Sequence, residues 1–261
     1  MSTTDGVIVD RQGATVVLKM SNPGRRNAFF PEMRRKLAAT LYSMGMDPEV
    51  RAFVLTGEDG HFCAGADLSR ARGAERTALS VRESMKDTHQ LLRGIVAGAR
   101  PVIAAVEGDA FGAGMSMTAA CDKVFSSRSA RFGSAFAKIG LLPDMGILYN
   151  LPQRVGLSKA RELLMLAVPI SAEEAHRIGL VDELVEPGKA LEAALCYADL
   201  IAELPPLPVS YTKAALATGI TSVEDAMRLE LDLQPILALS EDSREGVLAF
   251  KEKRKPKFSG K

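Results

Sequence analysis

Residues 106–122, which read VEGDAFGAGMSMTAACD, decide the fold of this chain. The apolar run just before them, residues 101–106, predicts a buried strand, and a loop of small residues leads from it to a helix expected to begin near Gly114. Such a junction points unpaired backbone N–H groups at whatever lies above the helix N-terminus. The stretch therefore favours an anion, or an oxygen that becomes negative during a reaction.

The glycine spacing of this stretch has two other interpretations. Gly108, Gly112 and Gly114 only loosely resemble the Gly-x-Gly-x-x-Gly loop of dinucleotide-binding proteins, and the pattern does not match it. Alternatively, the glycines form a tight turn that lets a strand and a helix pack closely. Close packing and a function at the helix start do not exclude each other.

The composition predicts a soluble protein. The chain has 261 residues, 47% of them hydrophobic, and a formal net charge of +1, so nothing in it calls for a nucleic acid or a membrane surface as partner. Cys63, Cys121 and Cys196 include no Cys-x-x-Cys pair, which argues against a disulfide framework or a zinc site and favours a reducing, cytoplasmic setting. We expect neither a signal peptide nor a membrane-spanning segment.

Up to about residue 157, strands alternate with helices, which indicates an α/β layer. The expected elements are a hairpin over residues 7–20, a helix from Pro31, a strand over 51–56, a helix over about 75–97, and strands over 101–106, 123–127 and 130–133.

Beyond residue 157, helices dominate. Ser171-x-x-Glu174 and Thr221-x-x-Glu224 are capping-box patterns, and residues 181–185 are the one strand expected there. The prolines of residues 205–208 interrupt a helix. We expect an α/β core over residues 1–190 and a helical C-terminal region over residues 191–261.

A second loop of small residues follows the strand over residues 51–56. It reads HFCAGADL over residues 61–68, and its Ala-Gly-Ala centre lets backbone approach a ligand. Two such loops, each after a strand, could aim one N–H apiece at a single carbonyl oxygen.

The segments CAGADL (63–68) and VIAAVEGDAFGAG (102–114) closely resemble the enoyl-CoA hydratase/isomerase (crotonase) superfamily. The other segments that are similar to family motifs follow in order through nearly the whole chain: 22–28, 139–146, 151–156, 171–182 and 249–254. The resemblance implies a spiral of ββα units, with a C-terminal helical region that assembles a homotrimer or a dimer of trimers.

The resemblance also implies an acyl-CoA substrate and chemistry through a thioester enolate, which the backbone amides of Ala66 and Ala113 would stabilise. Preorganised donors of this kind contribute about 3 kcal/mol each. Ala113 stands where many relatives have glycine, which matters little because the donor is backbone.

The acid and base groups depart from the family pattern. Hydratases that use two glutamates carry them at positions that match Ser116 and Phe136, and neither residue can shuttle a proton. Ser116, one helical turn beyond Ala113, could touch ligand or water, whereas Phe136 can only form a wall of the pocket. The ordinary hydratase mechanism therefore does not fit.

One carboxylate, Asp144, remains in the matching loop. In the superfamily, a carboxylate there serves some double-bond isomerases, including those that act on ring-derived acyl-CoA esters, and certain hydrolases and dehalogenases. Asp144 could take a proton from one carbon and return it two carbons away. An apolar pocket is expected to raise its pKa, lined by Phe111, Phe136, Leu141 and Leu142.

Other roles are possible for each acidic candidate. Asp144 could instead cap the helix that follows it. Glu83 is a candidate second acid, from the helix expected near the pocket mouth. For Asp67 a helix cap or a structural hydrogen bond is at least as good an account, and Glu107 and Asp109 are better suited to orienting loops. The histidines show no metal-ligand spacing, so we expect no metal.

Coenzyme A would enter as part of the substrate, with no tightly bound cofactor. Guanidinium groups suit phosphate, and the early segment supplies Arg25 and Arg26. By resemblance, the other residues matched to CoA contacts are Ala28, Ala64, Asp67 and Leu68, together with Phe250 and Lys253 from a neighbouring subunit.

The favoured function is an enoyl-CoA double-bond isomerase. The alternatives are an enoyl-CoA hydratase with an atypical acid/base group, an acyl-CoA thioester hydrolase and a non-catalytic CoA-binding scaffold. Outside the family, a dinucleotide-dependent dehydrogenase is the remaining option. The sequence does not define the acyl group.

Overall fold

The computed structural model describes residues 6–70 and 77–261. Its strands are Val7–Gln12 (β1), Thr15–Met20 (β2), Ala52–Gly57 (β3), Val102–Val106 (β4), Asp109–Phe111 (β5), Lys123–Ser127 (β6), Arg131–Gly133 (β7), Ile170–Ser171 (β8) and Glu183–Val185 (β9). Its helices are Pro31–Gly45 (α1), Ala78–Val96 (α2), Ala113–Ala120 (α3), Ile147–Val155 (α4), Leu157–Leu166 (α5), Ala172–Arg177 (α6), Ala190–Ala202 (α7), Pro206–Ala217 (α8), Val223–Ala238 (α9) and Glu241–Glu252 (α10), with a 3-10 turn at Ala137–Ile139 (η1).

Two sheets organise the chain. The larger has the order β1-β2-β3-β4-β6-β9, and the smaller has the order β5-β7-β8. In the larger sheet only the β1–β2 hairpin is antiparallel, and the remaining neighbours are parallel. The expected α/β fold is confirmed.

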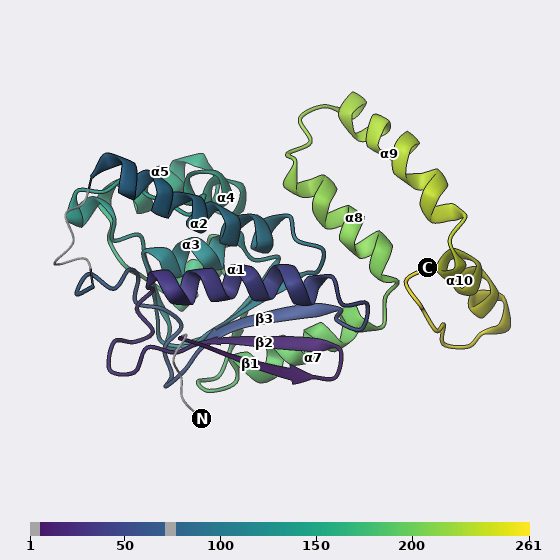
Figure 1. Cartoon of the computed structure of the whole chain (residues 1–261), viewed down its shortest axis with the longest axis horizontal. Coiled ribbons are helices and arrows are strands. Elements are labelled where there is room, and N and C mark those ends of the chain that lie inside the picture. The colour runs from purple at the N-terminus through teal and green to yellow at the C-terminus, as the bar shows by residue number, and fades with distance from the viewer. Residues whose placement is uncertain (1–5, 71–76) are drawn as a thin grey trace.

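Helices cover both faces of the larger sheet, which explains why its central strands are apolar throughout (Figure 1). Val17, Val54 and Ile103 face α7 and pack on its alanines. The alternate residues, such as Leu18 and Leu55, belong to the main core on the other face, to which α1, α2 and α3 contribute.

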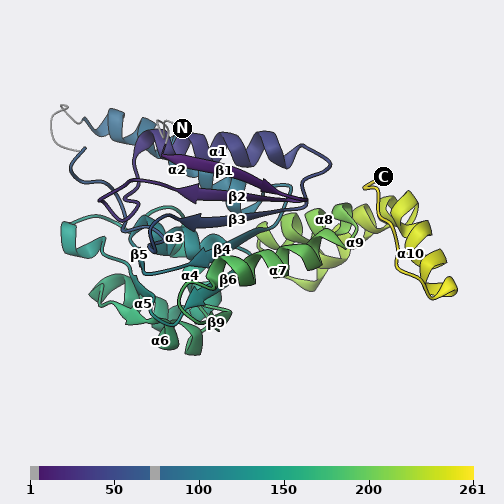
Figure 2. The same ribbon diagram turned by 90° about the horizontal axis from the view of Figure 1, so that it is seen from below.

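The chain beyond the expected boundary at residue 190 has two parts. The first, α7, packs directly on β3, β4 and β6. The second comprises α8, α9 and α10, and α9 and α10 extend away from the sheets (Figure 2). No residue of α9 is buried. No helix in the described ranges is long and apolar enough to cross a membrane.

Two details of the predicted secondary structure are wrong. Residues 181–185 were expected to form the only strand after residue 157, but β8 also lies there and pairs with β7. Only two residue pairs join β8 to β7, which is too short for a periodic pattern in the sequence. The second capping box is shifted by one residue. Ser222, with extended backbone at φ −140, caps α9 by accepting from Asp225 N–H at 3.1 Å, whereas the Thr221 hydroxyl contacts the Asp225 carboxylate.

Candidate active site

Two loops meet at one edge of the larger sheet. They follow β3 and β4, which are parallel neighbours, so both loops leave from the same edge. Phe62 N–H donates to Glu107 O at 2.8 Å, and Cys63 N–H donates to Asp109 O at 2.9 Å. Phe111 N–H returns a bond to Cys63 O at 2.9 Å. These backbone hydrogen bonds hold the two loops in a fixed relation.

Glycine is needed where the loops touch. Gly65 has φ +98, and a Cβ added there would lie 3.1 Å from Phe111 O. A Cβ on Gly114 would lie 2.3 Å from Cys63 O, which no side chain tolerates. The close-packing interpretation of the glycines is therefore right, and this packing is what brings the loops together.

Next to these close backbone contacts, two backbone N–H groups make no hydrogen bond within the described chain. Around Ala66, Phe29 N–H bonds Gly65 O at 2.7 Å and Asp67 N–H bonds Phe29 O at 2.9 Å, so the intervening Ala66 amide is unused. Ala113 is the first residue of α3, where an amide has no partner within the helix, and its N-cap Gly112 supplies no side chain. Within residues 6–70 and 77–261, neither amide donates to a protein acceptor.

Asp144 lies in the loop before α4 and is tied to α3. The Ser116 hydroxyl lies 3.1 Å from the carbonyl oxygens of both Gly112 and Asp144. Ser116 is fully buried at 0% exposure, so it anchors the Asp144 loop instead of presenting a hydroxyl to solvent. One helix thus supplies the Ala113 amide and holds the backbone of Asp144.

The side chain of Asp144 is partly buried, and burial raises its pKa, as expected. The positive charges of Arg34 and, to a smaller extent, His89 oppose this rise. Asp144 is not a helix cap, because Gly146 is the N-cap of α4 and no side chain caps that helix. The carboxylate is therefore not committed to a capping bond.

Two of the four side chains expected to line an apolar pocket are exposed. Phe136 is buried and Phe111 is half-buried, but Leu141 and Leu142 are 55% and 75% exposed. Just before them, Gly140 takes a left-handed conformation at the end of η1. In the single chain, these leucines are largely open to solvent.

Asp67 has a structural role. Its Oδ1 accepts from Ser69 Oγ at 2.6 Å and from Ser69 N–H at 3.1 Å, and Asn22 Nδ2 donates to Oδ2 at 3.3 Å. The Ser69 hydroxyl is the main cause of its lowered pKa. Arg25 lies 3.9 Å from the same carboxylate, with its own side chain 54% exposed.

Arg26 and the remaining acidic candidates also form hydrogen bonds or ion pairs within the chain. Arg26 Nη1 donates to Asp109 Oδ2 at 2.7 Å, and Arg131 binds the other oxygen of that carboxylate at 3.1 Å. Glu107 Oε1 accepts from the first amide of α7 at 3.1 Å. Glu83 is exposed on α2 and pairs with Lys86 at 2.8 Å, so its role as a second acid stays a prediction.

The expected CoA contacts separate into two groups. Ala28 and Ala64 lie beside the two loops that follow β3 and β4 (residues 58–68 and 107–112), which we call the oxyanion loops after their expected role. Ala64 N–H donates to Arg26 O at 3.0 Å, and Leu68 is 52% exposed nearby. Phe250, 86% exposed, and Lys253 lie at the end of α10, at the far end of the molecule (Figure 2). A single chain does not bring the second group to the site.

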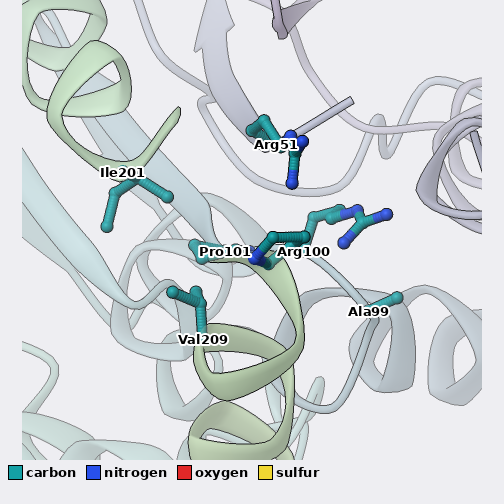
Figure 3. Close-up of a pocket in the computed structure, with 7 residues that line it drawn as sticks. Arg51, Ala99, Arg100, Pro101, Ile201 and Val209 are labelled. Carbon is teal, nitrogen blue, oxygen red and sulfur yellow. The ribbon is translucent and has the colours of Figure 1, made fainter. Parts of the chain in front are cut away.

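A shallow depression in the surface lies at the opposite edge of the sheet, at the start of β3 and β4. Figure 3 shows Arg51 and Arg100 side by side there, against Pro101, Ile201 and Val209. The oxyanion loops follow the other ends of the same strands, so this depression is separate from the candidate site.

Two backbone amides without a protein acceptor lie in the described chain at one edge of a parallel sheet, and the loop that carries Asp144 is tied to the helix that begins at Ala113. Preorganised backbone donors of this kind suit an oxygen that becomes negative during a reaction. The chain belongs to the enoyl-CoA hydratase/isomerase family, whose model matches residues 10–261. The family match replaces the dinucleotide-binding alternative.

Relatives match over nearly their whole lengths. The 1,2-epoxyphenylacetyl-CoA isomerase of Escherichia coli K12 is 36% identical over 94% of this chain and 95% of its own. The crotonyl-CoA hydratase of Syntrophomonas wolfei is 33% identical over 98% and 99%. The crystal structure of an enoyl-CoA hydratase from Polaromonas sp. JS666 superposes with a TM-score of 0.90 at 34% identity, covering 97% of this chain and 99% of that one.

Proposed function

We propose that this protein is an acyl-CoA double-bond isomerase in which Asp144 is the proton shuttle. The observation that carries the proposal is the Ser116 tether, which fixes a partly buried carboxylate loop to the helix that supplies the Ala113 amide. The Escherichia coli relative named as an isomerase of 1,2-epoxyphenylacetyl-CoA supports isomerisation of a CoA ester in general.

The proposed reaction moves one proton and one double bond. The Asp144 carboxylate removes a proton from the carbon next to the thioester of a 3-enoyl-CoA, and the electrons form an enolate. The Ala66 and Ala113 amides stabilise the enolate oxygen. Protonated Asp144 then returns the proton two carbons away, which re-forms the thioester carbonyl and leaves a 2-enoyl-CoA with the carboxylate regenerated.

Asp144→Asn tests this proposal. The amide is nearly the same size but cannot take up the proton, so turnover of a 3-enoyl-CoA should fall by roughly 1,000-fold or more, while binding of a CoA ester by calorimetry stays close to wild type. Ser80→Ala, which changes the exposed N3 residue of the α2 capping box, is the control. Undiminished turnover in Asp144→Asn would overturn the assignment.

Hydration is the second candidate, because most of the relatives that match are named hydratases. It requires a water activated by a group other than the matching glutamates, since Ser116 and Phe136 occupy those positions. Supplying a 2-enoyl-CoA and measuring the loss of the conjugated thioester absorbance separates the two reactions. Release of free CoA from a saturated ester would instead indicate thioester hydrolysis, and binding without any turnover would indicate a scaffold.

The proposal also covers the cofactor, the oligomeric state and the cellular location of the protein. Coenzyme A arrives with the substrate, and no tightly bound cofactor takes part. The apolar side chains exposed along α9 support a trimer, or a dimer of trimers, in which a neighbour's Phe250 and Lys253 reach the CoA. Free cysteines support a reducing, cytoplasmic location.

A further inference from the structure

One buried carboxylate, Asp109, binds two arginines that lie far apart in the sequence. Asp109 is the first residue of β5 and is 5% exposed. Its Oδ2 accepts from Arg26 Nη1 at 2.7 Å, and its Oδ1 accepts from Arg131 Nη2 at 3.1 Å. Each carboxylate oxygen thus holds a different guanidinium through a charge-assisted hydrogen bond, which brings two positive charges to one negative charge.

Both guanidinium groups keep most of their surface in solvent. The side chains of Arg26 and Arg131 are 60% and 61% exposed. Within residues 6–70 and 77–261, each guanidinium makes one hydrogen bond, to Asp109. Since a guanidinium carries five N–H donors, most of the donors on both arginines remain available to a ligand.

The backbone that carries Arg26 has an unfavourable conformation. Arg26 and its neighbour Asn27 both have left-handed backbone, at φ 47 and φ 57. Asn27 is 3% exposed, and its Nδ2 donates to Glu58 O at 2.8 Å and to His61 O at 2.7 Å. Left-handed backbone costs free energy for residues other than glycine, and it persists where surrounding contacts enforce it, above all at functional sites. The buried Asn27 network therefore fixes the point from which the Arg26 side chain extends.

Arg131 is also held in place. It is the first residue of β7 and pairs with Asp109 of β5 in the smaller sheet. Its N–H donates to Gly108 O at 2.9 Å, and its guanidinium lies 5.8 Å from the centre of the Phe111 ring. Burial alone would raise the pKa of Asp109, but the hydrogen bonds from the two arginines hold that pKa below its ordinary value. The carboxylate therefore stays ionised and keeps both guanidinium groups beside it.

The two arginines are joined directly to the oxyanion loops. Ala64 N–H donates to Arg26 O at 3.0 Å, and Cys63 N–H donates to Asp109 O at 2.9 Å. Ala64 lies two residues before Ala66, whose amide is a proposed oxyanion donor. The phosphates of a CoA ester are separated from its thioester by a long flexible arm. Positive groups beside these loops are therefore suited to the phosphate end of such a ligand.

We propose that Arg26 and Arg131, both held by Asp109, bind a phosphate group of the CoA substrate. Two guanidinium groups on one carboxylate leave an excess of positive charge, and their planar N–H donors match the geometry of phosphate oxygens. The inference rests on the proposed function only in taking a CoA ester as substrate. It adds Arg131, which was not among the residues matched to CoA contacts, and it makes Asp109 the positioning residue for both arginines.

Calorimetry with three ligands tests this proposal without depending on turnover. The ligands are CoA, 3′-dephospho-CoA, which keeps only the diphosphate, and pantetheine, which has no phosphate. The variants are Arg131→Gln, Arg131→Lys and Arg128→Gln. Arg128 is the matched control, because it lies three residues before Arg131, is 51% exposed and also pairs with one carboxylate, that of Glu186 at 3.3 Å.

Arg131→Gln should weaken the binding of CoA roughly tenfold or more, because it removes a charge-assisted hydrogen bond. Arg131→Lys should recover part of the affinity, since the charge remains but the planar fork is lost. Arg128→Gln should match wild type, and pantetheine should bind equally to all variants. A loss that disappears with 3′-dephospho-CoA supports the proposal with the 3′-phosphate as the bound group, and a loss that persists supports it with the diphosphate.

The positioning role is tested by Asp109→Asn, which keeps both arginines but weakens their common partner. This variant should also lose affinity for CoA and keep its affinity for pantetheine. If it does not fold, Arg26→Gln replaces it and should weaken CoA binding to a similar extent as Arg131→Gln. Unchanged CoA affinity in the variant that is used counts against the proposal.

Unchanged affinity of Arg131→Gln for CoA would overturn the proposal. The ion pairs of Asp109 would then only join β5, β7 and the turn at Arg26, and the variant would lose stability without losing affinity. A wild-type protein that turns over no 3-enoyl-CoA, yet binds CoA with this dependence on Arg131, would refute the proposed reaction and leave the phosphate site standing.

Discussion

At the scale of single residues, the buried carboxylate of Asp144 should lower the free energy of unfolding when it is ionised. Its folded-state pKa is raised by burial above the ordinary 3.8. For such a group, stability is fully present below the unfolded value and is lost as pH rises through the folded value. Asp144→Asn should therefore be more stable than wild type above that window and equal to it below. Urea unfolding at pH values on both sides of the window measures this, and a stability difference independent of pH would contradict it.

Gly114 is a second residue for which the structure predicts a clear effect of substitution on stability and turnover. A Cβ there would meet Cys63 O at 2.3 Å, between two backbones that cannot both yield. Gly114→Ala should lower the free energy of unfolding by about 2 kcal/mol and reduce turnover by moving the Ala113 amide. Gly45→Ala is the control, because its nearest neighbour would lie at 3.9 Å, and it should be neutral or stabilising.

At the scale of elements, one lysine fastens α8 to the core. Lys213 Nζ donates to Ile95 O at 2.6 Å, Arg100 O at 3.0 Å and Asp122 Oδ2 at 2.5 Å, and only 4% of its side chain is exposed. Lys213→Met removes the Nζ donor from the two carbonyls and leaves the Asp122 carboxylate with the Val102 N–H but without its cation, so we expect a loss of about 3 kcal/mol in denaturant unfolding.

The control for that change is Lys255→Met. Lys255 is 88% exposed and pairs with Glu203 at 3.4 Å, so its replacement should cost less than about 0.5 kcal/mol. Equal losses in the two variants would show that burial of Lys213 contributes nothing to the attachment of α8.

At the scale of the whole molecule, α9 leaves an apolar face uncovered in the single chain. Val223, Met227 and Leu231 repeat every four residues along it and are 64%, 55% and 75% exposed. An apolar helix face left uncovered in a single chain indicates an interface. Leu231→Glu should shift the assembly from trimer toward monomer in light scattering, whereas Asp232→Asn should leave the mass unchanged. A monomeric wild-type protein would contradict the expectation.

Assembly and substrate binding should be linked in the same molecule. Phe250 is 86% exposed and far from the oxyanion loops of its own chain. If a neighbour's Phe250 packs on the CoA, Phe250→Ala should raise KM for an acyl-CoA at least roughly fivefold with little change in kcat. Kinetics on the assembled enzyme test this, and an unchanged KM would place the CoA contacts within one chain.

The sequence by itself determined the order of most elements, the two loops of small residues and the family. Local sequence patterns encode these features, because strand and helix periodicity and glycine-dependent turns depend on neighbouring residues. The resemblance to family motifs placed Asp144 in the loop before a helix, and the apolar residues expected around it predicted the direction of its pKa shift. Prediction from local patterns failed at β8, which has only two residues, and at the N-cap of α9, which it misplaced by one residue.

Only the tertiary structure decided which distant groups meet. The Ser116 hydroxyl holds the Asp144 loop, Arg34 crosses to α2, and Leu141 is turned outward. No local pattern encodes such pairs, because a side chain's partner depends on how separately formed elements pack. The sequence therefore identified the oxyanion loops and the candidate base, while the packing of α1, α2 and α3 determined what surrounds that base.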